Sequence, residues 1–200
     1  FRCHCSKEGL KAREEAGYDK EILANVKFRK ALSLAINRED FAAKTTTSSL
    51  KGFGLFNSMH YYDVENGGVY RNTDDAKKVL CEVYGVEYTD ATLDEAVNSI
   101  TGYDLVQARK LVEEAYQEEL KAGTISATDI VKLTGGSGAI NETVTRRFNY
   151  IFDAWKELVK GTSLEGRFEF DEVKDFGTQW ANDFRGGAYD ICMGGWSGAA

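Results

Sequence analysis

Apolar side chains recur at helical spacing in three stretches of the chain. The first begins at Val26, the second runs from Asp104 to about Ala122 and ends at Gly123, and the third follows Asn141 and stops at Gly161. Apolar residues three or four positions apart form one face of an amphipathic helix, so each stretch predicts a helix with a buried stripe. The predicted stripes contain Phe28, Ala31, Leu32, Ala35 and Ile36; Leu105, Ala108, Leu111, Val112, Ala115, Tyr116 and Leu120; and Val144, Phe148, Ile151, Phe152, Trp155 and Val159.

Strand patterns alternate with these helices. Residues 1–5, 129–134 and 167–171 are predicted to form strands, and the nearly continuous apolar run 189–193 is typical of a central strand buried on both faces. Gly135–Gly138 is expected to form a turn between the strand 129–134 and the helix that Asn141 caps. Strand and helix in alternation predict an α/β fold with a mixed sheet flanked by helices, formed by residues 1–200 as a single domain.

The remaining segments have weaker patterns. Asn37–Asp40 ends the first helix and begins a short second one, and Asp74 or Asp75 is expected to cap a helix that reaches Tyr84. Thr92 and Glu95 have the spacing of a capping box, which predicts another helix start. A short helix is expected near residues 176–184, and residues 45–72 have no clear period, which predicts an irregular surface segment.

Composition narrows the class of protein. The 200 residues are 42% hydrophobic and carry 25 basic against 32 acidic side chains, for a formal net charge of −7. That apolar content is too high for an intrinsically disordered chain, and no apolar run is long enough to span a bilayer. Nucleic acid is not expected as a partner, because phosphate binding depends mainly on clustered Lys and Arg. The chain contains 0 prolines, which excludes a slow cis-proline folding step.

Four cysteines and two histidines limit the possible chemistry. Cys81 and Cys192 lie in apolar patterns and are expected to be small buried side chains. Cys3-His4-Cys5 could supply metal ligands, but zinc requires four, so alternation along a strand is the favoured interpretation and no metal or cofactor is predicted. No nucleophile motif surrounds His60, and Gly135–Gly138 lacks the Lys-Ser/Thr ending of a phosphate-binding loop. We therefore predict no catalytic residues.

The end of the last predicted strand is the strongest candidate site. There the chain reads Gly194-Gly195-Trp196-Ser197-Gly198. Glycines let another backbone or a ligand approach closely, and ligands of open α/β sheets bind beyond the carboxyl ends of the strands. A buried Trp at a turn of the chain explains the same residues, so both interpretations stay open.

Three motifs resemble one family of proteins. Residues 25–40, Asn-Val-Lys-Phe-Arg-Lys-Ala-Leu-Ser-Leu-Ala-Ile-Asn-Arg-Glu-Asp, resemble the signature helix of family 5 extracellular solute-binding proteins, the oligopeptide- and dipeptide-binding receptors of ABC importers. Tyr103-Asp104 followed by 108–115 resembles a second family motif, and Tyr189-Asp190-Ile191 with Gly194-Gly195-Trp196 resembles a third. The resemblance covers nearly the whole chain from Asn25.

This resemblance implies a receptor of two lobes with a type II periplasmic-binding-protein-like fold. The chain is expected to be lobe two, excised between two crossing strands at residues 1–5 and 189–196, and it would need the first lobe of the same parent chain as a partner. The implied function is capture of a peptide or other small solute outside the cytoplasm, in the periplasm or on a lipid anchor, and delivery to ABC permease subunits. It implies a binding protein rather than an enzyme.

The resemblance also suggests which residues contact the solute. Main-chain groups near Gly194, Gly195, Trp196 and Ser197 are expected to bind it, and the loop from Gly135 to Ser137 is expected to face the cleft. One departure stands out. Many peptide-binding members have an Asp three residues after this Trp to pair with the ligand's amino group, and this chain has Ala199. An unpaired ammonium is costly to bury, so a blocked peptide, an oligosaccharide or another solute is an alternative, as are a Cys/His enzyme and an interaction module using residues 45–72.

Overall fold

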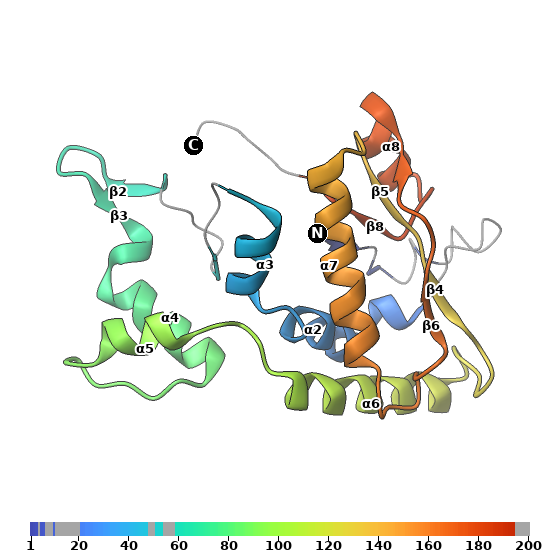
Figure 1. Ribbon diagram of the computed structural model, residues 1–200. Helices are drawn as coiled ribbons and strands as arrows, with labels where there is room; N and C mark the ends of the chain where they lie inside the picture. Colours follow the sequence, from blue (N-terminus) through green and yellow to red (C-terminus); the bar gives the residue numbers. More distant parts are fainter. Residues whose placement is uncertain (4, 7–9, 11–20, 48–50, 54–58, 195–200) are drawn as a thin grey trace. The chain divides into compact units, whose positions relative to one another are not determined.

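A computed structural model describes the chain except residues 4, 7–9, 11–20, 48–50, 54–58 and 195–200 (Figure 1). Contacts divide the described residues into two compact units. Unit 2 is Asn37–Tyr103, and unit 1 combines the described residues of Phe1–Ile36 with those that follow Tyr103, up to Gly194. No helix in the described part of the chain has the length and apolar content needed to cross a membrane.

The first helices of unit 1 follow the predicted stripes closely. A 3-10 turn, η2 (Glu21–Ala24), leads into α2 (Val26–Leu34), where the Asn25 side chain accepts hydrogen bonds from the backbone N–H groups of Lys27 and Phe28. Helix α6 (Leu105–Ala122) begins at the Asp104 cap and ends at Gly123, whose left-handed backbone suits glycine. α2 packs along α6, and Lys27 pairs with Glu114 and Glu118 of α6 at 2.8 and 2.7 Å.

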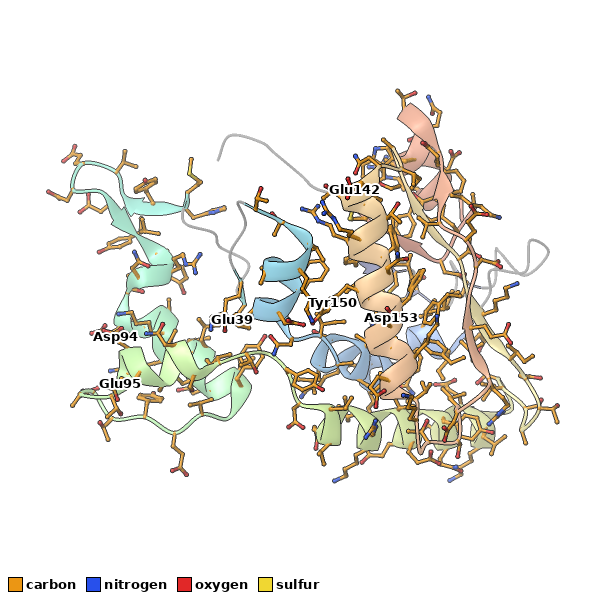
Figure 2. All side chains as sticks on the ribbon, viewed as in Figure 1. Glu39, Asp94, Glu95, Glu142, Tyr150 and Asp153 are labelled. Carbon is orange, nitrogen blue, oxygen red and sulfur yellow. The ribbon has the colours of Figure 1, made fainter. Side chains whose placement is uncertain are left out.

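The third predicted helix, α7 (Glu142–Leu158), supplies the largest apolar side chains of unit 1. Its buried face holds Val144, Phe148, Ile151, Phe152, Trp155 and Leu158, while Glu142 and Asp153 lie on its wet side (Figure 2). The Trp155 indole Nε1 donates to the Leu32 carbonyl at 2.9 Å, which ties α7 to the end of α2. Amphipathic spacing and the Asn141 cap therefore placed this helix correctly, as predicted.

A four-stranded mixed sheet lies in the same unit. Its order is β1 (Arg2–Cys3), β8 (Ile191–Cys192), β5 (Gly135–Ser137) and β7 (Lys174–Asp175). β8 pairs antiparallel with β1 and parallel with β5, so it is central and fully buried, as its apolar run predicted. β4 (Val131–Leu133) and β6 (Phe168–Phe170) form a separate parallel pair. This α/β architecture with a mixed sheet and flanking helices confirms the predicted fold class.

The segment after β7 is less regular than predicted. A 3-10 turn, η4 (Gly177–Gln179), runs directly into the short helix α8 (Trp180–Arg185). No residue of either element is buried. The chain then returns to the sheet through Gly186 and Gly187, and Tyr189 and Asp190 are both fully buried just before β8.

The helices and strands of unit 2 are short, and they differ from the prediction in three places. It contains α3 (Arg38–Thr45), β2 (Tyr61–Asp63), β3 (Gly68–Val69), η3 (Tyr70–Asn72), α4 (Asp74–Tyr84) and α5 (Leu93–Ser99). β2 and β3 form an antiparallel hairpin inside 45–72, where the pattern predicted no regular structure. Asn66-Gly67, with φ of 70° at Gly67, is a turn signal that could have revealed it.

In unit 2 the predicted cap of α4 is wrong, while α5 begins after Thr92 as predicted but without the capping-box hydrogen bond. α4 is capped by Thr73 rather than by Asp74 or Asp75, because the Thr73 hydroxyl accepts the Ala76 N–H at 3.2 Å and both aspartates already lie inside the first turn. At α5, Thr92 precedes the helix but makes no cap hydrogen bond. Its hydroxyl instead accepts the backbone N–H of Thr89 at 2.9 Å, so the capping box does not form.

Candidate functional site

The predicted loop at Gly135–Ser137 is a strand. These residues form β5, which is buried along its length and pairs with both β7 and β8. The prediction of a turn is therefore wrong. Thr134 separates β4 from β5, so the chain passes from the β4–β6 pair into the four-stranded sheet before it turns toward α7.

Aromatic rings explain the glycines of β5. A Cβ at position 135 would lie 2.8 Å from the Phe148 ring, and one at position 136 would lie 2.6 Å from Phe176 and 2.7 Å from Tyr189. Phe176 and Tyr189 are themselves stacked, with ring centroids 4.2 Å apart. Only glycine lets these rings contact the strand directly, because real Cβ atoms do not approach other atoms so closely.

The same explanation applies to Gly194. A Cβ there would lie 2.4 Å from the Trp180 indole, and a Cβ at Gly138 would lie 2.5 Å from the other end of the same ring. The indole thus spans the ends of β5 and β8. The close approach predicted at Gly194 is real, and the group that approaches is a side chain of this protein. The remaining predicted site residues Gly195, Trp196 and Ser197 lie outside the described residues, as does Ala199.

At this edge of the sheet, the polar groups of Ser137 and Asp175 form hydrogen bonds within the protein. The Ser137 hydroxyl donates to the Met193 carbonyl at 3.4 Å, and the Ser137 carbonyl accepts the Phe176 N–H at 3.0 Å. Asp175 accepts the N–H groups of Ile140 and Gly177 at 3.2 and 2.8 Å, which fixes the chain on both sides of the edge. Ser137 is only 6% exposed, so its backbone and hydroxyl hold the strands together in this conformation.

Asp190, within the third motif, is fully buried and was not singled out by the sequence. Its carboxylate accepts the Thr134 N–H at 2.9 Å, across the change from β4 to β5. The Thr134 hydroxyl donates to Asp171 at 3.2 Å, and Lys132 pairs with Asp171 at 2.7 Å. That hydrogen bond from Lys132 lowers the pKa of Asp171. Asp190 therefore orders the strand that leads to the candidate site rather than pointing out of it.

Three of the four thiols, those of Cys3, Cys81 and Cys192, do not have the environment of a nucleophile. Cys81 and Cys192 are fully buried, as predicted. Burial, with the nearby Cys5 as the next contribution, raises the pKa of Cys3, whereas an activated thiolate needs a lowered one. Among the residues that the structure describes, no cluster of His, Cys, Asp and Glu could hold a metal ion. The enzyme alternative requires His60 near Trp196, and Trp196 lies outside the described ranges.

A surface pocket of about 200 Å³ lies elsewhere in unit 1, at the amino end of β4. It is lined by Glu21, Ile22, Thr124, Ile125, Asp129, Ile130 and Val131. None of the predicted site residues lines it. The carboxyl ends of β5 and β8, where Ser137 and Gly194 lie, therefore remain the candidate site.

Comparison with the solved structure of a Listeria OppA supports the fold. The chain is similar to Listeria monocytogenes OppA bound to peptide, with a TM-score of 0.53 and 19% identity over 88% of this chain and 27% of that one. Haemophilus influenzae OppA in complex with RPPGFSPFR gives a TM-score of 0.44 and 16% identity over 87% of this chain and 26% of that one. The chain thus spans about a quarter of the length of these proteins. No curated protein sequence matches it.

Comparison with protein families agrees with the sequence motifs. The model of bacterial extracellular solute-binding proteins, family 5 Middle, matches residues 8–200. That range includes the motifs at 25–40, 103–115 and 189–196, and it covers nearly the whole chain. The chain belongs to the family 5 bacterial extracellular solute-binding proteins.

Proposed function

We propose that this chain takes part in capturing a peptide for an ABC importer, as one wall of the ligand cleft of a two-lobed receptor. The family match over residues 8–200 carries the proposal. The fold shared with an OppA whose structure is bound to peptide supports peptide as the solute. Closure of two lobes would bury the solute between them, which is how such receptors gain affinity.

The partners follow from this role. The first lobe of the same receptor would supply the opposite wall, and the permease subunits of the importer would receive the solute. The receptor would act outside the cytoplasm, free in the periplasm or held by a lipid anchor at the membrane. Binding alone is required, so we propose no catalytic step.

Native mass spectrometry of the intact receptor, purified without refolding, tests the proposal directly. We expect a fraction of molecules to carry extra mass that unfolding releases and that fragments as peptide. The 200-residue chain alone is expected to bind such peptides at least 100-fold more weakly, because half of the contacts would be absent. Repeated preparations with neither bound solute nor affinity for a peptide mixture would contradict peptide capture.

Ala199, where many peptide-binding members have Asp, leads us to propose that the receptor does not require a free amino terminus on the peptide. We expect the intact receptor to bind N-acetyl-Ala-Phe-Ala at least as tightly as free Ala-Phe-Ala, since no Asp at this position balances the ammonium charge. Isothermal titration with the two tripeptides measures the difference. The Ala199→Asp variant is the matched test and should shift the preference toward the free peptide. Binding of an oligosaccharide but of neither tripeptide would favour the alternative solute class.

A further inference from the structure

Helix α8 sits at the edge of the sheet where the candidate site lies, next to the end of β5 in Figure 1. The helix has no buried residue. Glycines with positive φ stand on either side of it, at 52° for Gly177 and 84° for Gly187. Three hydrogen bonds at its end are local, from the N–H groups of residues 186–188 to carbonyls within residues 182–184. Gly187 is buried where the chain rejoins the core, but residues 177–186 before it have the anchoring of a surface flap rather than that of a core helix.

Trp180 and Phe184 join this flap to the rest of unit 1. The half-buried Trp180 indole contacts Gly138 with its pyrrole edge and Gly194 with its benzene edge. The Tyr189 hydroxyl donates to the Trp180 carbonyl at 2.8 Å, and the Phe184 and Tyr189 ring centroids lie 5.4 Å apart. Both glycines are needed for this contact, because a Cβ at either would overlap the ring.

We propose that α8 is a lid, hinged at Gly177 and at Gly186–Gly187, and that Trp180 is its latch over the carboxyl ends of β5 and β8. The inference rests on the proposed function and on the predicted position of the solute at these strand ends. The indole lies on the backbone of Gly194, where the solute is expected to bind. An arriving solute must therefore displace it.

The surface that the indole leaves defines what replaces it. Two glycines present a flat backbone surface with no side chain between them, which suits a planar ring better than a branched or charged group. An aromatic side chain of the solute would recover the contacts that Trp180 gives up. The lid therefore favours peptides with an aromatic residue over peptides of alanine.

Hydrogen exchange tests the lid without any solute. We expect the amides of 186–188 to exchange about 100-fold faster than those in the middle of α6, because the flap opens without unfolding the core. Gly194→Ala should accelerate the 186–188 amides further by pushing the indole away. Gly52→Ala, where no described residue lies within 4 Å of an added Cβ, should leave them unchanged. Exchange of 186–188 as slow as that of α6 would overturn the lid.

Fluorine NMR of 5-fluorotryptophan follows the latch itself. The chain has 3 tryptophans, so Trp180→Phe identifies the relevant signal. In the intact receptor, N-acetyl-Ala-Phe-Ala should shift this signal and bind at least 10-fold more tightly than N-acetyl-Ala-Ala-Ala. Equal binding of both peptides with an unmoved Trp180 signal would overturn the lid and leave peptide capture intact. If no solute binds although residues 186–188 exchange rapidly, the proposed function is contradicted. The claim that a solute displaces Trp180 is then contradicted as well.

Discussion

Units 1 and 2 are stabilised in different ways. Unit 1 buries large rings against strands and helices, with Phe28, Phe148 and Tyr189 fully buried. The core of unit 2 consists of Cys81, Leu93, Ala96 and Ile100, with partly buried side chains around it. The ion pair between the half-buried Lys77 of α4 and the exposed Asp94 at the start of α5 (Figure 2) contributes little to stability. We infer that unit 1 is the rigid part and that unit 2 opens first.

The hairpin of unit 2 also exposes large apolar side chains to solvent. Unit 2 exposes Met59, Tyr62 and Val64 around its hairpin to 73%, 66% and 79%. A two-stranded hairpin is marginally stable in water unless something packs on it. The strands at the candidate site of unit 1, by contrast, are fixed by packed rings and hydrogen bonds, and only segment 177–186 beside them is a surface flap. A large, packed core is what allows glycine strands such as β5 to be held in place.

Among the substitutions considered, Phe148→Ala is expected to lower the stability of unit 1 the most. Phe148 is fully buried, packs on Gly135 and lies 5.1 Å from the Phe1 ring, so its removal leaves a cavity beside β5. We expect a loss of about 3–5 kcal/mol in the free energy of unfolding, measured by urea denaturation. Val106→Ala, at a position 83% exposed on α6, is the control and should change it by less than about 0.5 kcal/mol. Similar losses for both variants would contradict a core centred on α7.

Ile100→Ala tests whether unit 2 opens separately. Ile100 is 3% exposed and belongs to the small core of unit 2. We expect a loss of about 2 kcal/mol that is confined to this unit. Hydrogen exchange should then accelerate in α4 and α5 and stay unchanged in α6 and α7. Equal acceleration in all four helices would show that the two units unfold as one.

The fold was predictable where local signals agree. α6 and α7 combine helical spacing with a polar cap and, for α6, a terminal glycine, so their bounds follow closely from the sequence. Strand β8 was recognisable because a central strand is apolar at every position. These signals depend only on neighbours within one element.

The candidate site was less predictable because its cause is not local. Gly135-Gly136-Ser137 shows no alternation, and it is a buried strand only because Phe148, Phe176 and Tyr189 pack on it from distant parts of the chain. Trp180 was not singled out from the sequence. Gly138 and Gly194, which have no side chains of their own, could have suggested that a large aromatic ring packs against them. The role of the glycines in contacting a solute remains a prediction.

Glu113→Ala tests the polar support of unit 1 and its dependence on pH. Burial acts against the Glu113 carboxylate, but hydrogen bonds from the Ser163 N–H, from Gln117 and from the Ser163 hydroxyl outweigh it and lower its pKa. Its contribution is therefore complete above the ordinary pKa of 4.5 and is lost as the pH falls through the lower folded value. We expect Glu113→Ala to cost about 1–2 kcal/mol at pH 7.

Urea denaturation at pH 7, 4.5 and 3 measures this effect. The difference between the wild type and Glu113→Ala should shrink at the lowest pH. The Glu113→Ala variant should still lose some stability as the pH falls, because the pKa values of Asp129 and Asp171 are lowered as well. A difference that grows on acidification would contradict the sign of the shift.

Arg147→Met has the smallest expected effect and tests a weakness in the helix that carries the unit 1 core. The Nε of Arg147 is a buried donor that has no hydrogen-bond partner among the residues that the structure describes. An unsatisfied buried donor lowers stability, while the aliphatic part of the side chain still packs. We expect methionine to keep that packing and to change the free energy of unfolding by between zero and about 1 kcal/mol, in the stabilising direction. Arg146→Met, which breaks an exposed pair with Glu142, is the control and should be neutral or slightly destabilising. If Arg147→Met destabilises the chain by more than about 1 kcal/mol, its guanidinium stabilises unit 1 through its charge, and the unpaired Nε is not a net cost to the rigid unit.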